Sequence, residues 1–111
     1  MNYTTKNENG IKHLYLHGRF DAHVTPEIRQ WLEAEASKPP AQILVNLKEV
    51  NFIDSTALAA LVQGMKRCRQ QDGDLVLCNL QQPVWIIFEL TRLDKAFAIF
   101  EDESGARDAF A

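Results

Sequence analysis

Three consecutive oxygen-bearing side chains, Asp54, Ser55 and Thr56, are the residues of this sequence whose types and spacing best suit chemistry. They follow a short apolar segment rich in branched side chains and precede an Ala/Leu-rich segment, a pattern typical of a strand that passes directly into a helix. The first helical turn has backbone N–H groups without partners, and an Asp or Ser there caps the helix for about 1 kcal/mol. That end of the helix also favours an anion, so a hydroxyl at Ser55 is well placed to carry a phosphate.

An enzyme would need a nucleophile with a base and oxyanion donors. Ser55, His23 and Asp21 supply the residue types of a Ser-His-Asp triad, but no G-x-S-x-G elbow surrounds the serine and no sign of a buried acid orients the histidine. The sequence also lacks a phosphate-binding G-x-x-x-x-G-K loop and an H-E-x-x-H motif. We therefore expect no catalytic residues, no cofactor and no enzymatic activity. Hydrolysis at Ser55 is a third-ranked alternative that labelling by a serine reagent would reveal.

Two pairs of residues could in principle bind a metal. His13 and His17 lie on one face of an alternating segment, but no Cys, Asp or Glu joins them there, so we interpret them as exposed strand histidines. Cys68 falls on an apolar helix face and Cys78 in an apolar strand-like segment. We interpret both as small buried side chains in a reducing cytoplasm, rather than as a disulfide or metal pair.

Length and composition predict one globular domain over residues 1–111. The chain is 46% hydrophobic and 24% charged, which is close to the globular average. Its formal net charge is −3 with twelve scattered basic residues, so nucleic acid is not expected as the main partner. No apolar run approaches the ~20 residues of a membrane span, and the first five residues are polar, so we expect neither membrane insertion nor a signal peptide.

Hydrophobic periodicity predicts strands that alternate with helices. Leu14, Leu16 and Phe20 lie on the expected core face of one strand. The expected strands are 1–10, ending in an Asn9-Gly10 turn, then 11–20, 43–47, 75–80 and 97–100, with a polar junction at 48–51. Helices are expected to begin at Thr25-Pro26-Glu27, where Thr25 would be the cap, at the Asp54 junction, at Gln81-Gln82-Pro83 and at Glu103.

The helices have apolar stripes at helical spacing. The expected inward residues are Ile28, Trp31 and Leu32 in the first helix, Leu58, Leu61, Val62, Met65 and Cys68 in the second, and Val84, Ile87, Phe88 and Leu90 or Thr91 in the third. Trp85 and Ile86 lie off this third stripe, either as a partner surface or covered by neighbouring elements. The order β-β-α-β-α-β-α-β-α predicts an α/β domain with a mostly parallel sheet and an N-terminal antiparallel strand.

Three segments carry a resemblance to a known family. The sequence FIDSTALAAL, residues 52–61, resembles the D-S-[ST]-G-[LI]-[GA] signature of STAS domains. The sequence GRFDA, residues 18–22, resembles the G-x-[LF]-D-x loop of the same family, and residues 88–97 are similar to its late-helix segment. The order of elements fits as well, so the resemblance covers nearly the whole chain. The family includes the stand-alone anti-sigma-factor antagonists of bacteria and the cytosolic domains of sulfate transporters.

This resemblance implies a regulatory function. In the family, an anti-sigma factor that is also a serine kinase holds a sigma factor inactive, and the unphosphorylated antagonist binds the kinase and frees the sigma factor. The kinase phosphorylates the antagonist to escape it, and a PP2C-type phosphatase resets the cycle. The phospho-acceptor maps to Ser55. The partner-binding residues implied by the motif and its loop are Asp21, Asp54, Ser55, Thr56, Ala57 and Leu58.

The chain departs from the family pattern by having Ala57 and Ala59 where glycines are usual. We expect each methyl group to project near the surface that a partner backbone approaches. A second hypothesis is therefore a STAS adaptor that is not phosphorylated and docks on a membrane-transport ATPase or a signalling scaffold, with Ser55 acting only at the helix start.

Overall fold

The computed structural model describes residues 2–111 and contains the predicted order of elements. The strands are β1 (Asn2–Glu8), β2 (Ile11–Phe20), β3 (Gln42–Ile53), β4 (Asp74–Cys78) and β5 (Ala98–Phe100). The helices are α1 (Thr25–Glu35), α2 (Ser55–Gln70), α3 (Gln82–Leu90) and α4 (Glu103–Asp108), with a 3-10 turn η1 (Leu93–Lys95). Met1, the first residue of the predicted edge strand, lies outside the described residues.

The five strands form one mixed sheet in the order β1-β2-β3-β4-β5. β1 is antiparallel to β2, and all other neighbours are parallel, so the predicted fold class is confirmed. Asn9 and Gly10 both have positive φ, 55° and 81°, which is the backbone that a tight two-residue hairpin requires.

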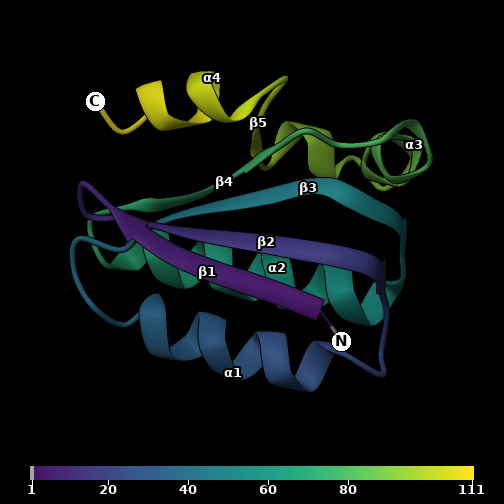
Figure 1. The fold of residues 1–111 in the computed structure, drawn as a ribbon, viewed down its shortest axis with the longest axis horizontal. Helices are drawn as coiled ribbons and strands as arrows, with labels where there is room; N and C mark the ends of the chain where they lie inside the picture. The colour runs from purple at the N-terminus through teal and green to yellow at the C-terminus, as the bar shows by residue number, and fades with distance from the viewer. Residues whose placement is uncertain (1) are drawn as a thin grey trace.

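Helices cover the two faces of the sheet unequally. α1 and α2 lie together along one face, and α4 lies on the other (Figure 1). Ile43, Val45 and Leu75 point into the larger core, whereas Leu44 and Val76 belong to a smaller cluster with Ala106 of α4. The strands β3 and β4 are therefore buried on both faces, as their nearly continuous apolar sequences predict.

β3 is longer than predicted. The polar segment 48–51, expected as a junction, continues the strand to Ile53. Its pairing with β2 explains this: Val50 is opposite Gly18 and Phe52 is opposite Arg19, after two irregularities in the register. Val50 is fully buried, so one apolar residue in a polar segment holds the strand to the core.

Two predictions about α3 and its neighbours are wrong. Either Leu90 or Thr91 was expected to complete the inward stripe, yet Leu90 is 75% exposed and Thr91 is also exposed. The buried part of α3 consists of Val84 and Phe88. The strand predicted for 75–80 ends at Cys78, because Asn79 adopts a positive φ of 59°. The last helix begins at Glu103 as predicted and ends at Asp108.

His13 is buried rather than exposed, which corrects the sequence prediction. Its side chain has no solvent exposure, because it packs between the Tyr15 ring and Glu103 at the start of α4. The ring stacks on Tyr15 with Nδ1 3.4 Å from the Tyr15 hydroxyl and 3.9 Å from Glu103. Burial lowers the pKa of His13 below its ordinary value, and the Glu103 carboxylate offsets only part of that effect. Within the described residues, no group of three or more His, Cys, Asp or Glu side chains is placed to hold a metal ion.

Cys68 and Cys78 are free thiols on opposite faces of the sheet, as expected for small buried side chains. Burial raises the pKa of each thiol to about 12. In the part of the chain that the structure describes, no helix has the length and apolar character needed to cross a membrane.

Candidate functional site

Ser55 is the first residue of α2 and its side chain is exposed. The cap of the helix is the preceding residue, because Asp54 Oδ1 accepts the backbone N–H of Ala57 at 2.9 Å. The Ser55 hydroxyl is therefore not needed to satisfy the first turn. It stands free at the positive end of a sixteen-residue helix.

The same carboxylate joins this helix start to the loop after β2. Asp54 Oδ2 accepts the backbone N–H of Ala22 at 2.8 Å, and the Asp54 N–H is 3.3 Å from the carbonyl oxygen of Phe20. The loop and the helix start, more than thirty residues apart in sequence, are thus held side by side. The two motifs that carried the family resemblance form one surface.

Asp21 lies in that loop and orders it. Its Oδ1 accepts the backbone N–H of His23 at 3.0 Å, and its Oδ2 is 3.6 Å from Arg19 Nε. Thr25, predicted as the cap of α1, instead donates its hydroxyl to the Asp21 carbonyl oxygen at 2.7 Å. The hydrogen bond that joins Asp21 to His23 therefore involves the backbone of His23, and it does not orient the imidazole ring as a catalytic acid would.

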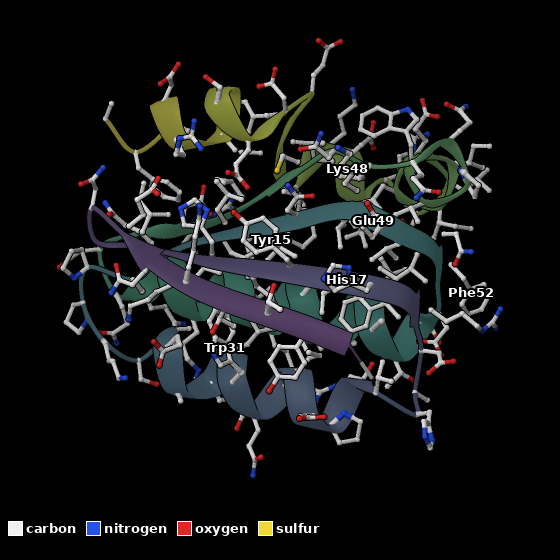
Figure 2. All side chains as sticks on the ribbon, viewed as in Figure 1. Tyr15, His17, Trp31, Lys48, Glu49 and Phe52 are labelled. Carbon is white, nitrogen blue, oxygen red and sulfur yellow. The ribbon has the colours of Figure 1, made fainter. Side chains whose placement is uncertain are left out.

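Arg19 and Phe52 form a pair beside this surface that the sequence analysis missed. The Arg19 guanidinium carbon lies 3.8 Å from the centre of the Phe52 ring, close enough for a cation–π contact. Phe52 is 36% exposed and lies where β3 approaches α2, at the edge of the molecule (Figure 2). The available sequence signal was a large apolar residue, Phe52, directly after the polar segment 48–51.

The six predicted partner-binding residues differ in exposure. Ser55 and Thr56 are exposed, and Asp21 and Asp54 are half-buried. Ala57 and Leu58 are buried in the core, so the Ala57 methyl group does not project to the surface as expected, whereas Ala59 is exposed. Of the two alanines that replace glycines, only Ala59 adds a side chain to the outer face.

Trp85 and Ile86 of α3 lie apart from this surface. Ile86 is 42% exposed, and the half-buried Trp85 lines a shallow hollow with Leu80 and Phe100. Neighbouring elements therefore cover part of Trp85, whereas Ile86 is an exposed apolar side chain.

Comparison with known proteins identifies the family. The model of the STAS domain matches residues 2–106, almost the whole chain. The chain is a member of the STAS domain family. The DST segment and the loop at 18–22, which carried the resemblance, both lie within the matched residues.

The relatives of this STAS domain include regulators of sigma factors. An anti-sigma-B factor antagonist from Listeria monocytogenes is 31% identical over 86 residues, which cover 78% of this chain and 75% of the Listeria protein. A Thermotoga maritima structure described as a putative anti-sigma factor antagonist has the same fold, with a TM-score of 0.90 and 21% identity over 96% of this chain and 92% of that one. The Bacillus cell fate determinant SpoIIAA, solved in its phosphorylated form, superposes with a TM-score of 0.76 at 18% identity, covering 99% of this chain and all of that one.

Proposed function

We propose that this STAS domain is an anti-sigma-factor antagonist whose binding to an anti-sigma factor is switched off by phosphorylation of Ser55. The observation that carries the proposal is that Asp54 caps α2, which leaves the Ser55 hydroxyl exposed and free of a structural task. The Listeria relative named as an anti-sigma-B factor antagonist supports the partner class. The phosphorylated form of SpoIIAA shows that a protein of this fold can carry the modification.

The electrostatics of the site would make the switch effective. A phosphate adds a charge of roughly −1.5 to −2 at neutral pH. At the N-terminus of α2 it would meet favourable backbone dipoles, so the domain would keep its fold. It would also stand beside the carboxylate of Asp54 and near that of Asp21, so the surface becomes strongly negative. A partner shaped for a small neutral hydroxyl would meet both added bulk and like-charge repulsion.

In this proposal the kinase contacts the exposed residues Ser55 and Thr56 and the carboxylates of Asp21 and Asp54. Ala57 and Leu58 contribute through the backbone of the first helical turn, because their side chains are buried. The anti-sigma factor is the serine kinase and supplies the Mg-ATP, and a PP2C-type phosphatase would remove the phosphate. This cycle belongs in the bacterial cytoplasm, where sigma factors act.

The test is the intact mass of the domain after incubation with Mg-ATP and the serine-kinase anti-sigma factor from its own genome. We expect one phosphate, absent in Ser55→Ala and present in the matched variant Thr56→Ala. Ser55→Asp should retain the native circular dichroism spectrum and lose binding to the kinase. A domain that binds its partner but never gains a phosphate would favour the adaptor hypothesis.

A further inference from the structure

A groove between α1 and α2 has a charge opposite to that of the whole chain. Its volume is about 350 Å³, and its rim residues include Arg29 and Glu33 of α1 and Gln63, Lys66 and Arg67 of α2. Three cations and one carboxylate thus surround a groove on a protein with a formal net charge of −3.

These cations are also unusual in having no acidic partner. Within the described part of the chain, seven of the twelve basic side chains form ion pairs, and three of the remaining five are in this groove. Arg29 donates a hydrogen bond to the neutral amide oxygen of Gln63, which leaves its charge uncompensated. Neither Lys66 nor Arg67 forms an ion pair with another described residue. Three cations without ion pairs outweigh the single carboxylate of Glu33, so the groove carries net positive charge that is complementary to an acidic ligand.

The floor of the groove is apolar and made of small or buried groups. Gly64 is buried, and a Cβ added there would lie 3.2 to 3.6 Å from Leu75 and Leu32, so the chain approaches closely here. Leu32 and Ala60 are also buried beneath the rim. An occupant of the groove would therefore meet apolar surface below and cations at the sides, which suits an amphipathic segment rather than a free ion.

The spacing of the cations fits a helical segment. Arg29 stands beside Gln63, and Arg67 follows Gln63 by one helical turn, about 6 Å along α2. Two carboxylates at positions i and i+4 of an acidic helix have about the same separation. A phosphate could bridge two cations at this spacing, so it is the apolar floor of the groove that favours an amphipathic segment over a free ion. With only three cations, the groove is also too weakly charged for nucleic acid.

The groove is close to the Ser55 surface. Gln63 follows Ser55 by two helical turns, about 12 Å along α2, with the exposed Ala59 between them. A protein interface of standard size covers roughly 800 Å² per partner, a patch with a radius of about 16 Å. A partner centred on Ser55 would therefore reach the groove.

We propose that the α1–α2 groove binds an acidic helical segment of the same protein partner that docks at Ser55. This proposal rests on the proposed function and adds a second contact to it. In this proposal the groove attracts and orients the partner, and the phosphorylation state of Ser55 determines whether the complex forms.

The first experiment probes the groove alone by NMR titration of the isotopically labelled domain. The probe is a synthetic helical peptide with glutamates at i and i+4 in an alanine background, and its control has glutamine at those positions. We expect shifts of backbone amides at 29–33 and 60–70 with the acidic peptide only. The double variant Lys66→Glu/Arg67→Glu should weaken that binding at least tenfold. The matched variant Lys48→Glu/Arg92→Glu, which reverses the two other unpaired cations, should not.

Inorganic phosphate and phosphatidylglycerol vesicles are titrated in parallel. Equal shifts with phosphate alone would overturn the proposal in favour of a small-anion site, and equal shifts with the vesicles would assign the groove to a membrane surface. No shift with any probe would also overturn it.

The second experiment measures affinity for the serine-kinase anti-sigma factor as a function of salt. We expect Lys66→Glu/Arg67→Glu to weaken binding at least tenfold and to reduce its salt dependence, while Lys48→Glu/Arg92→Glu remains like the unsubstituted protein. If Ser55 phosphorylation abolishes binding but the groove variant binds normally, the groove proposal fails and the switch stands. If the groove variant weakens binding but phosphorylation has no effect, the switch fails and the groove stands.

Discussion

At the scale of single residues, the site separates two tasks that the sequence placed side by side. Asp54 satisfies the first turn of α2 with one oxygen and the loop at Ala22 with the other. Ser55, one residue later, does not cap the helix, and its side chain remains exposed. This division allows the hydroxyl to be modified without disturbing the fold, because the cap does not depend on it.

The two residues should therefore differ sharply in their effect on stability. We expect Asp54→Ala to lower the free energy of unfolding by about 1–2 kcal/mol, since it removes a helix cap and an interloop contact. Ser55→Ala should change it by less than about 0.5 kcal/mol, as for other exposed positions. Urea unfolding followed by circular dichroism measures both, with Asp54→Asn as a variant that keeps an acceptor. A larger loss from Ser55→Ala than from Asp54→Ala would mean that the hydroxyl is structural.

The buried His13 makes the stability of the folded state depend on pH. Its pKa is lowered by burial, and the charged groups that act on it are Glu103 and Arg107 of α4 and Lys6 and Glu8 of β1. Below its ordinary pKa of 6.5 the unfolded chain takes up a proton that the folded chain resists. Stability is therefore lost as the pH falls below 6.5, at up to about 1.4 kcal/mol per pH unit.

This is checked by urea unfolding between pH 7.5 and 5.5 for His13→Phe. As the pH is lowered, we expect the unfolding free energy of His13→Phe to decrease less steeply than that of the unsubstituted protein. A constant offset from the larger ring does not affect this comparison of slopes. The control is His23→Gln, which removes an exposed imidazole that is not part of the buried cluster. Parallel pH profiles for His13→Phe and the unsubstituted protein would contradict the assignment.

At the scale of elements, two turns with glycine constrain the chain in different ways. Gly10 needs its positive φ of 81° for the β1–β2 hairpin, but a Cβ there would meet no other atom within 4 Å. Gly73, between α2 and β4, has no such φ, but a Cβ there would lie 1.9 Å from the carbonyl oxygen of Ala41. That close approach is fixed by two backbone hydrogen bonds of 3.0 Å, from Ala41 N–H to the Gln71 carbonyl and from Asp74 N–H to the Ala41 carbonyl.

Alanine substitutions should lower the free energy of unfolding by different amounts at these two turns. Gly73→Ala should cost about 3 kcal/mol or more, because the backbone of the 41–42 segment must move to relieve the clash. Gly10→Ala should cost about 1 kcal/mol, the ordinary penalty for a side chain in the left-handed region. Thermal and urea unfolding of the two variants gives the comparison. An equal or smaller cost at Gly73 would show that the Ala41 segment yields easily.

The elements also show where sequence reasoning succeeded and where it stopped. Regular spacing of apolar residues was enough for the order of helices and strands and for the Asp54 junction. The extension of β3 depended on pairing Val50 with Gly18 across the sheet, a non-local contact with no local signal. The burial of His13 depended in the same way on where α4 docks. The Arg19–Phe52 pair and the α1–α2 groove arise only when distant segments meet.

At the scale of the whole molecule, the sheet separates two cores of very different size. The larger one lies beneath α1 and α2 and also holds Phe88 of α3. The smaller one lies beneath α4, a helix of six residues in which only Ala106 is fully buried. Local opening is easiest where little apolar surface is buried, so we expect α4 to detach at a lower free energy than the rest of the domain.

The two cysteines report on this difference, because Cys68 lies in the larger core and Cys78 in the smaller one. Neither is exposed, and with pKa values of about 12 neither thiol is reactive in the closed state. Alkylation with iodoacetamide at pH 8 should therefore follow opening, and we expect Cys78 to react at least ten times faster than Cys68. Peptide mass spectrometry of the unsubstituted protein measures both rates in one sample, and labelling in urea provides the rates for open chains. Equal native rates would mean that α4 opens only with the whole domain, so that the small core and the large one unfold as a single unit.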